Sequence, residues 1–150
     1  MAFHFRPAVA GDAAECVRVR GLTRESAISE ERLRKAGITV ASWANDIERG
    51  DLPGFVCESG GRVVGCCFGA KSSGEVVVLA LLPVHEEQGV GRQLLQMVID
   101  RLRGFGHRRL FLGCSPDPAC RSYGFYRRLG WRSTGAFDRN GDEVLELLFE

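Results

Sequence analysis

A continuous apolar run followed by a helical pattern marks the middle of the chain. Residues 76–82 are apolar, rich in β-branched side chains and closed by Pro83. At this length and composition, the run predicts a strand that is buried on both faces. Within residues 94–105 the apolar positions recur at spacings of three and four, which predicts a helix with one apolar stripe. Gly104 and Gly106 are placed to end this helix.

The turn between these two elements has the outline of an anion site. A short polar segment leads to Gly89-Val90-Gly91, and Arg92 follows directly. The first amides of a helix have no partner inside it, and the helix dipole adds partial positive charge there. Glycines let a phosphate approach that backbone, and Arg92 adds a formal charge. A tight turn that needs its glycines for conformation alone is the alternative.

Two familiar nucleotide motifs do not fit this turn. The dinucleotide fingerprint requires a third small residue three positions after its second glycine, where this chain has Leu94. The apolar segment 110–112 that follows ends without a carboxylate for a ribose. A Walker loop requires Lys-Ser or Lys-Thr after its last glycine, and this chain has Arg92-Gln93. The turn is therefore expected to bind another phosphate-containing ligand.

Further strands are predicted where short apolar or alternating runs lie between turn residues. Gly60-Gly61 and Asn140-Gly141 are hairpin signals, each between two such runs. Besides the central strand, the predicted strands cover residues 3–6, 55–59, 62–68, 109–114, 131–137 and 144–149.

Helices are predicted before the sheet and near its end. Asp12, Ser29 and Thr39 are candidate caps for three short helices, and a last helix, ending at Gly130, carries Tyr126. The order is a strand, helices, three strands, a helix, a strand, a helix and two strands. It predicts an α/β fold (α+β mixed) with a mostly antiparallel sheet, one βαβ crossover and flanking helices. Residues 1–150 are expected to form a single domain.

Charge and hydropathy narrow the expected partners. The formal net charge is +1 over 150 residues, so neither nucleic acid nor an anionic membrane surface is an expected partner. No apolar run approaches the roughly 18 residues that span a bilayer. Residues 1–20 carry charges throughout, unlike a signal peptide, and a cytoplasmic protein is expected.

The cysteines predict neither disulfides nor a metal site. Free cysteine among apolar neighbours behaves as a small hydrophobic residue, so core thiols in a reducing compartment are expected. No pair has the CxxC spacing and the three histidines are scattered, so no metal is predicted. The six are Cys16, Cys57, Cys66, Cys67, Cys114 and Cys120.

Two motifs together resemble a known family. Residues 81–83, then five residues, then Gly89-Val90-Gly91-Arg92 and a pair of leucines are similar to the acyl-CoA-binding motif of the GNAT superfamily of N-acetyltransferases. Residues 122–131, SYGFYRRLGW, resemble that family's closing helix. The order of predicted elements also matches the GNAT fold across essentially the whole chain.

The resemblance implies an N-acetyltransferase with acetyl-CoA as co-substrate. An amine, either a small molecule or a protein lysine or N-terminus, would attack the thioester directly in a ternary complex. Tyr126 matches the tyrosine that hydrogen-bonds the CoA sulfur and protonates the leaving thiolate. Glu75 has the offset of the catalytic glutamate in the histone-acetyltransferase branch, so it is the candidate base. The cofactor-binding residues carried over are Leu81, Leu82, Gln88, Gly89, Val90, Gly91, Arg92 and Tyr126.

The chain departs from the family at one place and leaves alternatives open. Glu86 and Glu87 stand where the family usually has Arg or Gln and then Gly, and two carboxylates repel a diphosphate. A non-catalytic acyl-CoA sensor and, less favoured, a nucleotide-binding protein are the alternatives. The hairpin after residue 131 either pairs across a homodimer edge or closes its own sheet. Charged residues of the 23–50 segment are interpreted as a solvated face, with substrate contact as the alternative; they are Arg24, Glu25, Glu30, Glu31 and Arg34.

Overall fold

The computed structural model of the protein describes residues 2–25 and 27–150, and the order of its elements confirms the expected one. The strands of this part are β1 (His4–Pro7), β2 (Gly54–Ser59), β3 (Arg62–Gly69), β4 (Val76–Leu81), β5 (Arg109–Cys114), β6 (Arg132–Phe137) and β7 (Glu143–Leu148). The helices are α1 (Ala13–Arg20), α2 (Glu30–Lys35), α3 (Val40–Glu48), α4 (Val90–Gly104) and α5 (Arg121–Arg128), with 3-10 turns η1 (Ala10–Asp12) and η2 (Pro83–His85).

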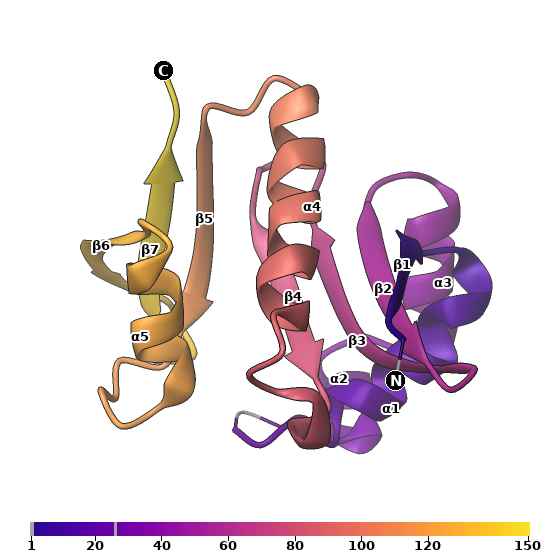
Figure 1. Cartoon of the computed structure of the whole chain (residues 1–150). Coiled ribbons are helices and arrows are strands. Elements are labelled where there is room, and N and C mark those ends of the chain that lie inside the picture. Colours follow the sequence, from indigo (N-terminus) through magenta and orange to yellow (C-terminus); the bar gives the residue numbers. More distant parts are fainter. Residues whose placement is uncertain (1, 26) are drawn as a thin grey trace.

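The strands form two antiparallel sheets that are joined by one crossover. The first has the order β1-β2-β3-β4 and the second the order β5-β7-β6. The chain passes from β4 through α4 to β5, which runs parallel to β4. Within the described residues one isolated bridge joins this pair, between Glu75, immediately before β4, and Phe111 of β5. Beyond this bridge β4 and β5 separate (Figure 1). The mixed α/β fold with a βαβ crossover is therefore confirmed.

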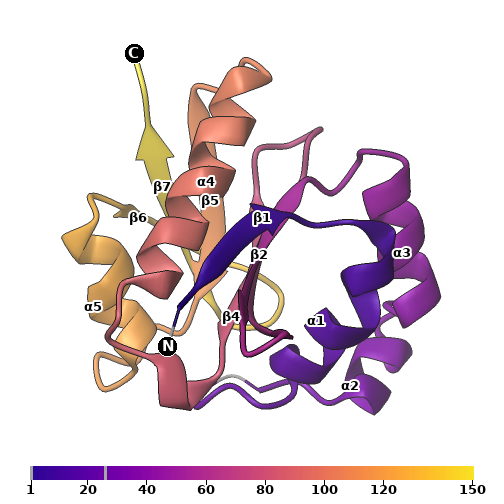
Figure 2. The same cartoon turned by 45° about the vertical axis from the view of Figure 1, so that its right-hand side comes forward.

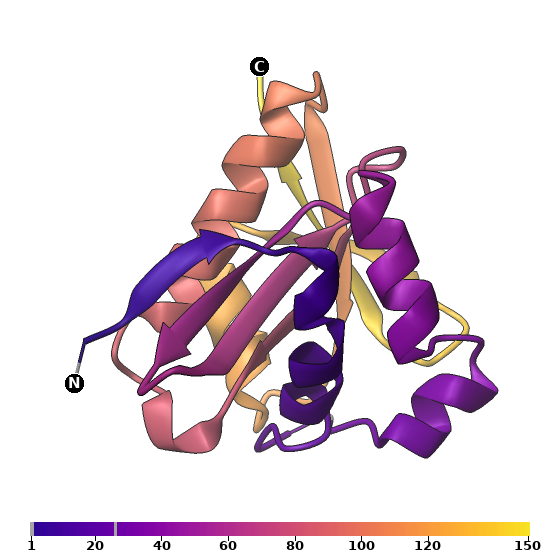
Figure 3. The same cartoon turned by 90° about the vertical axis from the view of Figure 1, so that its right-hand side faces the viewer.

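Helices cover the first sheet on both faces. Helix α4 packs on one face and α1 and α3 on the other, with the strands between them (Figure 3). Figure 2 shows α5 on the same side as α4, beside the second sheet. Alternate residues of β2 and β3 serve the two cores: Phe55 and Cys57 face α4, whereas Val56 and Cys66 face α1. The five buried cysteines all lie in these two cores, as expected of free thiols.

The prediction that the central strand is buried on both faces holds only in part for β4, which contributes Val76 to one core and Ala80 to the other. Val76 and Ala80 are buried, but Val77 is 43% exposed and Val78 and Leu79 are only partly covered. The strands buried on both faces are β2 and β3 instead. β4 remains half open because its neighbour on the other side, β5, turns away from it. Its apolar composition reflects that position beside a cavity.

Two of the three predicted caps are confirmed. The side chains of Ser29 and Thr39 accept hydrogen bonds from the Arg32 and Ser42 amides at 3.2 and 3.0 Å. Asp12 precedes α1 as predicted, but its side chain makes no hydrogen bond to the first turn of α1.

The Asp12 carboxylate instead ties β1 to the loop before α1. It accepts two hydrogen bonds from Arg6, both of 2.8 Å, and one from the Val9 amide. Asp12 is 7% exposed, and these three donors compensate for its burial. The same hydrogen bonds, with Arg6 as the largest cause, hold the pKa of Asp12 below its ordinary value.

The final hairpin lies inside its sheet. β7 pairs with β5 on one side and with β6 on the other, so β6 is the edge strand. β7 therefore closes its own sheet, which is one of the two arrangements that the sequence left open, and a homodimer remains an untested prediction. In the part of the chain that the structure describes, no helix is long and apolar enough to cross a membrane.

We expect Asp12→Asn to lower the free energy of unfolding at pH 7 by about 2 kcal/mol, because Arg6 loses a buried charged partner. A lowered folded pKa stabilises the protein fully above the ordinary Asp pKa of about 3.9, and this contribution is lost as the pH falls below it. The difference between variant and wild type in urea unfolding should therefore shrink below pH 4. Glu58→Gln removes the other, more exposed partner of Arg6 and should change stability by less than about 1 kcal/mol. A pH-independent Asp12→Asn difference would contradict this assignment.

Candidate active site

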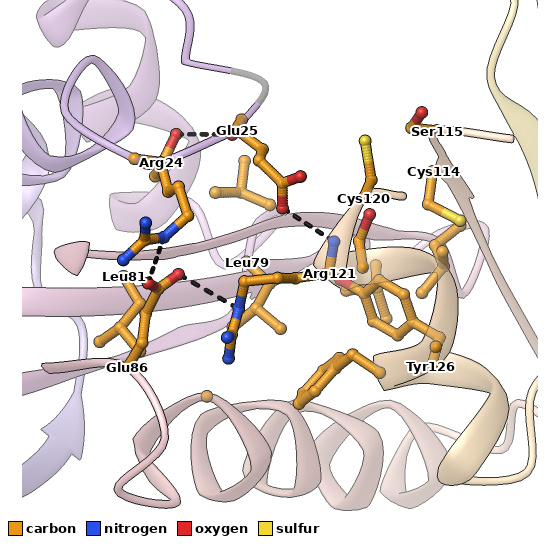
Figure 4. Close-up of a pocket in the computed structure, with 18 of the residues that line it drawn as sticks. Arg24, Glu25, Leu79, Leu81, Glu86, Cys114, Ser115, Cys120, Arg121 and Tyr126 are labelled. Atoms are coloured by element: carbon orange, nitrogen blue, oxygen red, sulfur yellow. Dashed lines mark hydrogen bonds and ion pairs between the residues drawn. The ribbon is translucent and has the colours of Figure 1, made fainter. Parts of the chain in front are cut away.

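The separation of β4 from β5 opens a cavity of about 700 Å³. Its walls come from β4, the start of α4, the end of β5, helix α5 and the loop after α1. Figure 4 shows a charged group at one end, formed by Arg24, Glu86 and Arg121, and Tyr126 with Cys114 at the other. The cavity thus joins a polar mouth to a more enclosed end beside the aromatic core.

Strand β4 supplies the floor of the cavity. Two consecutive residues of β3 pair with Val78 and with Val76 of β4. Val77, between them, has no partner on β3 and forms a bulge. The Leu82 amide donates to the Val64 carbonyl at 2.9 Å, towards β3. Because amides point to alternate sides along a strand, the Leu81 amide points away from β3, towards the edge of β4 from which β5 has separated. Leu81 lines the cavity, whereas Leu82 lies outside its lining.

The turn before α4 presents unpaired amides at the mouth. Gly89 caps the helix in the left-handed region at φ 82°, and the first hydrogen bond of the helix runs from the Gln93 amide to the Gly89 carbonyl. The amides of Val90, Gly91 and Arg92 therefore precede the hydrogen-bonded part of α4. The Val90 side chain is buried in the core, and Gly91 and Arg92 line the cavity.

Gly91 has room for a side chain on the protein side. A Cβ added there would meet its first neighbour, Phe125 Cζ, at 3.8 Å, an ordinary van der Waals distance. Its backbone is helical, so alanine would also fit the conformation. Neither packing nor conformation explains this glycine. Close approach of a ligand to the amides would explain it.

Tyr126 joins the cavity to the core. It is 9% exposed, lines the cavity and packs edge-on against Phe125 and Trp131, at ring distances of 5.1 and 6.0 Å. Burial, with smaller effects of Cys67 and Cys114, raises the pKa of its phenol. The phenol is therefore protonated at neutral pH and can only act as a hydrogen-bond donor or neutral acceptor there.

Glu75 lies apart from the lining of the cavity. It sits immediately before β4, at the bridge to Phe111. Burial and the carboxylate of Asp138 raise its pKa. Asp142, in the turn before β7, does line the cavity, and burial and Asp138 raise its pKa as well. Asp138 itself is occupied in the turn, since its Oδ1 accepts from the Asn140 and Asp142 amides.

The structure brings together part of the predicted site. The lining contains Leu81, Gly89, Gly91, Arg92 and Tyr126, whereas Leu82, Gln88, Val90 and Glu75 lie outside it. Sequence reasoning missed Arg121 and Asp142, and interpreted Arg24 and Glu25 as a solvated face although both line the cavity. The acidic pair at residues 86–87 was the available signal for Arg24 and Arg121, because two adjacent carboxylates beside a turn that is predicted to bind phosphate require cationic partners.

Comparison with known proteins identifies the family. Residues 19–131 match the acetyltransferase (GNAT) family. The chain belongs to the GNAT family. A relative by sequence is the amino-acid acetyltransferase of Neisseria meningitidis, 37% identical over 60 residues, which are 37% of this chain and 14% of that protein. The match therefore spans a small part of that relative's length. This membership confirms the predicted resemblance to the family.

Solved structures confirm the GNAT fold over the full chain. The PaiA N-acetyltransferase from Thermoplasma acidophilum, in complex with coenzyme A, superposes with a TM-score of 0.81 at 17% identity and covers 99% of this chain and 100% of that one. The yncA protein from Salmonella typhimurium, with its cofactor acetyl-CoA, gives a TM-score of 0.73 at 19% identity and covers 100% and 95%.

Proposed function

We propose that this GNAT protein transfers an acetyl group from acetyl-CoA to an amine by direct attack in a ternary complex. The observation that carries the proposal is the cavity between β4 and β5, which has unpaired helix amides at its mouth and a protonated tyrosine at its inner end. The coenzyme A and acetyl-CoA complexes of structurally similar proteins support the cofactor.

The acyl-CoA is proposed to lie in the cavity in one direction. The diphosphate would lie against the amides of Val90, Gly91 and Arg92, where the dipole of α4 favours negative charge. The pantetheine arm would follow β4 and bond to amides, such as that of Leu81, that have lost β5 as a partner. The thioester would then reach Tyr126 at the inner end.

Tyr126 is proposed to act on the leaving sulfur. The amine nitrogen forms a bond to the acetyl carbon, the C–S bond breaks, and the electron pair goes to sulfur. A thiol has a pKa of about 8.5, below that of a phenol, so complete proton transfer from Tyr126 is uphill. The phenol therefore stabilises the developing thiolate by donating a hydrogen bond. The thiolate then takes up the proton that the nitrogen releases as the amide forms, which leaves the amide and the thiol of CoA.

The amine must lose a proton, and two carboxylates are candidates to receive it. A lysine-like amine with a pKa of about 10.4 is neutral in well under ~1% of molecules at pH 7. Glu75 is the candidate from the family pattern. Asp142 is the candidate from the structure, because it lines the cavity. The acceptor is proposed to be a small-molecule or protein amine that enters beside Glu25 and Asp142.

We expect acetyl-CoA, but not NAD or ATP, to stabilise the protein. At one hundred times its dissociation constant, the ligand adds about 2.7 kcal/mol, which raises the midpoint of thermal unfolding by roughly 5–10 °C. Gly91→Ala should unfold at or slightly above the wild-type temperature without ligand but lose most of this shift. Gly104→Ala, in the same helix and away from the cavity, should keep it. The absence of a shift in the wild type would contradict the proposed function.

Tyr126→Phe should lower kcat by roughly tenfold to a hundredfold and leave the Kd for acetyl-CoA unchanged. Phenylalanine retains the ring contacts to Phe125 and Trp131 and removes only the donor. Tyr123→Phe is the matched control, because Tyr123 is on the same helix and outside the lining. Steady-state kinetics with an amine found by screening measure the effect. A Tyr126→Phe enzyme with wild-type kcat would refute the role of the phenol.

The base is tested by comparing Asp142→Asn with Glu75→Gln. A base acts only when deprotonated, so kcat/KM should fall as the pH drops through its pKa, which for both groups is above the ordinary value. We expect Asp142→Asn to lower kcat/KM at pH 7 by at least about tenfold and to remove this acidic limb. Glu75→Gln should have the smaller effect. The reverse order would assign the base to Glu75, and two unchanged profiles would leave deprotonation to water.

A further inference from the structure

The turn that should receive a diphosphate carries two carboxylates. Glu86 and Glu87 line the mouth of the cavity beside Gly89 and Gly91. Glu87 adopts φ 65°, a left-handed conformation that non-glycine residues rarely take. The backbone of the turn is thus kept in a shape suited to glycine, while the side chains reverse its charge. Arg92 supplies one positive charge in the turn itself against two carboxylates, so further cations for a diphosphate must come from elsewhere in the chain.

Two arginines from distant segments meet these carboxylates. Arg24 Nε donates to Glu86 Oε1 at 2.7 Å, and Arg121 Nε lies 3.4 Å from Glu86 Oε2. Arg121 Nη1 also donates to Glu87 Oε1 at 3.2 Å. The Glu25 side chain accepts from the Arg121 amide at 2.9 Å. The network therefore links the loop after α1, the turn before α4 and the start of α5 (Figure 4).

The exposure of these side chains shows which groups face the ligand space. The Glu86 side chain is 16% exposed, while those of Arg24 and Arg121 are 57% and 46% exposed. The arginines therefore cover the carboxylate, while their own side chains remain accessible. A guanidinium carries five N–H donors and binds phosphate in a bidentate manner, and the contacts to Glu86 use the Nε donor of each arginine.

We propose that Arg24 and Arg121 bind the phosphates of the acyl donor together with the turn, and that Glu86 occupies them until the diphosphate replaces its carboxylate. The inference rests on the proposed function. The two arginines and the two glutamates of the turn sum to zero charge, so the free mouth offers an incoming diphosphate no net attraction from these side chains. Binding is an exchange of anions on the arginines, and Glu86 weakens it by competition.

The test is the affinity for CoA in three single variants, measured by isothermal titration. Arg24→Gln and Arg121→Gln should each weaken CoA binding by about tenfold and reduce its dependence on salt. Glu86→Gln should tighten CoA binding by about threefold to tenfold. Arg49→Gln is the matched control, because Arg49 is 58% exposed, ion-paired to Asp46 and Asp51, and outside the cavity lining.

A ligand without phosphates separates this role from an effect on the cavity. S-acetylpantetheine, titrated by NMR at millimolar concentration, should bind the wild type and the variants of Arg24, Arg121 and Glu86 equally. Three outcomes would overturn the inference while leaving the proposed function standing. The variants of Arg24 and Arg121 could lose affinity equally for both ligands, or they could bind CoA as tightly as Arg49→Gln does. The third such outcome is weaker CoA binding by Glu86→Gln. A wild-type protein that binds neither ligand would overturn both.

Discussion

The structure depends on the separation of two parallel strands. β4 and β5 share one bridge, at Glu75 and Phe111, and then part. Backbone groups that lose a strand partner are unfavourable when buried, so the gap is stable only where solvent or a ligand can satisfy them. The bulge at Val77 and the start of α4 open into the same gap. One interruption of the sheet thereby creates the cavity and the backbone donors that line it.

Tyr126 shows how the site is built into the core. Its ring packs on Phe125 and Trp131, and its backbone carbonyl accepts from the Trp131 amide, which fixes the end of α5. The burial that positions the ring also raises the pKa of the phenol and keeps its proton in place. Stability and the proposed chemistry therefore impose the same requirement on this residue. The hydroxyl is the only part of the side chain that packing alone does not explain.

Local signals in the sequence predict the elements well and their surroundings less well. Gly60-Gly61 and Asn140-Gly141 place both hairpins, because a two-residue turn is decided by its own backbone. The burial of β4 could not be predicted, since it depends on β5, which lies beyond a whole helix in the sequence. Asp12 precedes its helix as predicted, but its partner is Arg6 on a strand. Predictions from local sequence fail where a side chain or a strand contacts residues that are distant in the sequence.

The charges at the mouth of the cavity also depend on partners that are distant in the sequence. Within the turn alone, Glu86 and Glu87 disfavour a phosphate-binding site, whereas the glycines favour one. The conflict disappears once Arg24 and Arg121 are placed beside them, from 62 and 34–35 residues away in the sequence. The backbone of the turn provides the donors, and the fold provides the charge. A motif read without its tertiary partners therefore gives the shape of a binding site but can give the wrong sign for its electrostatics.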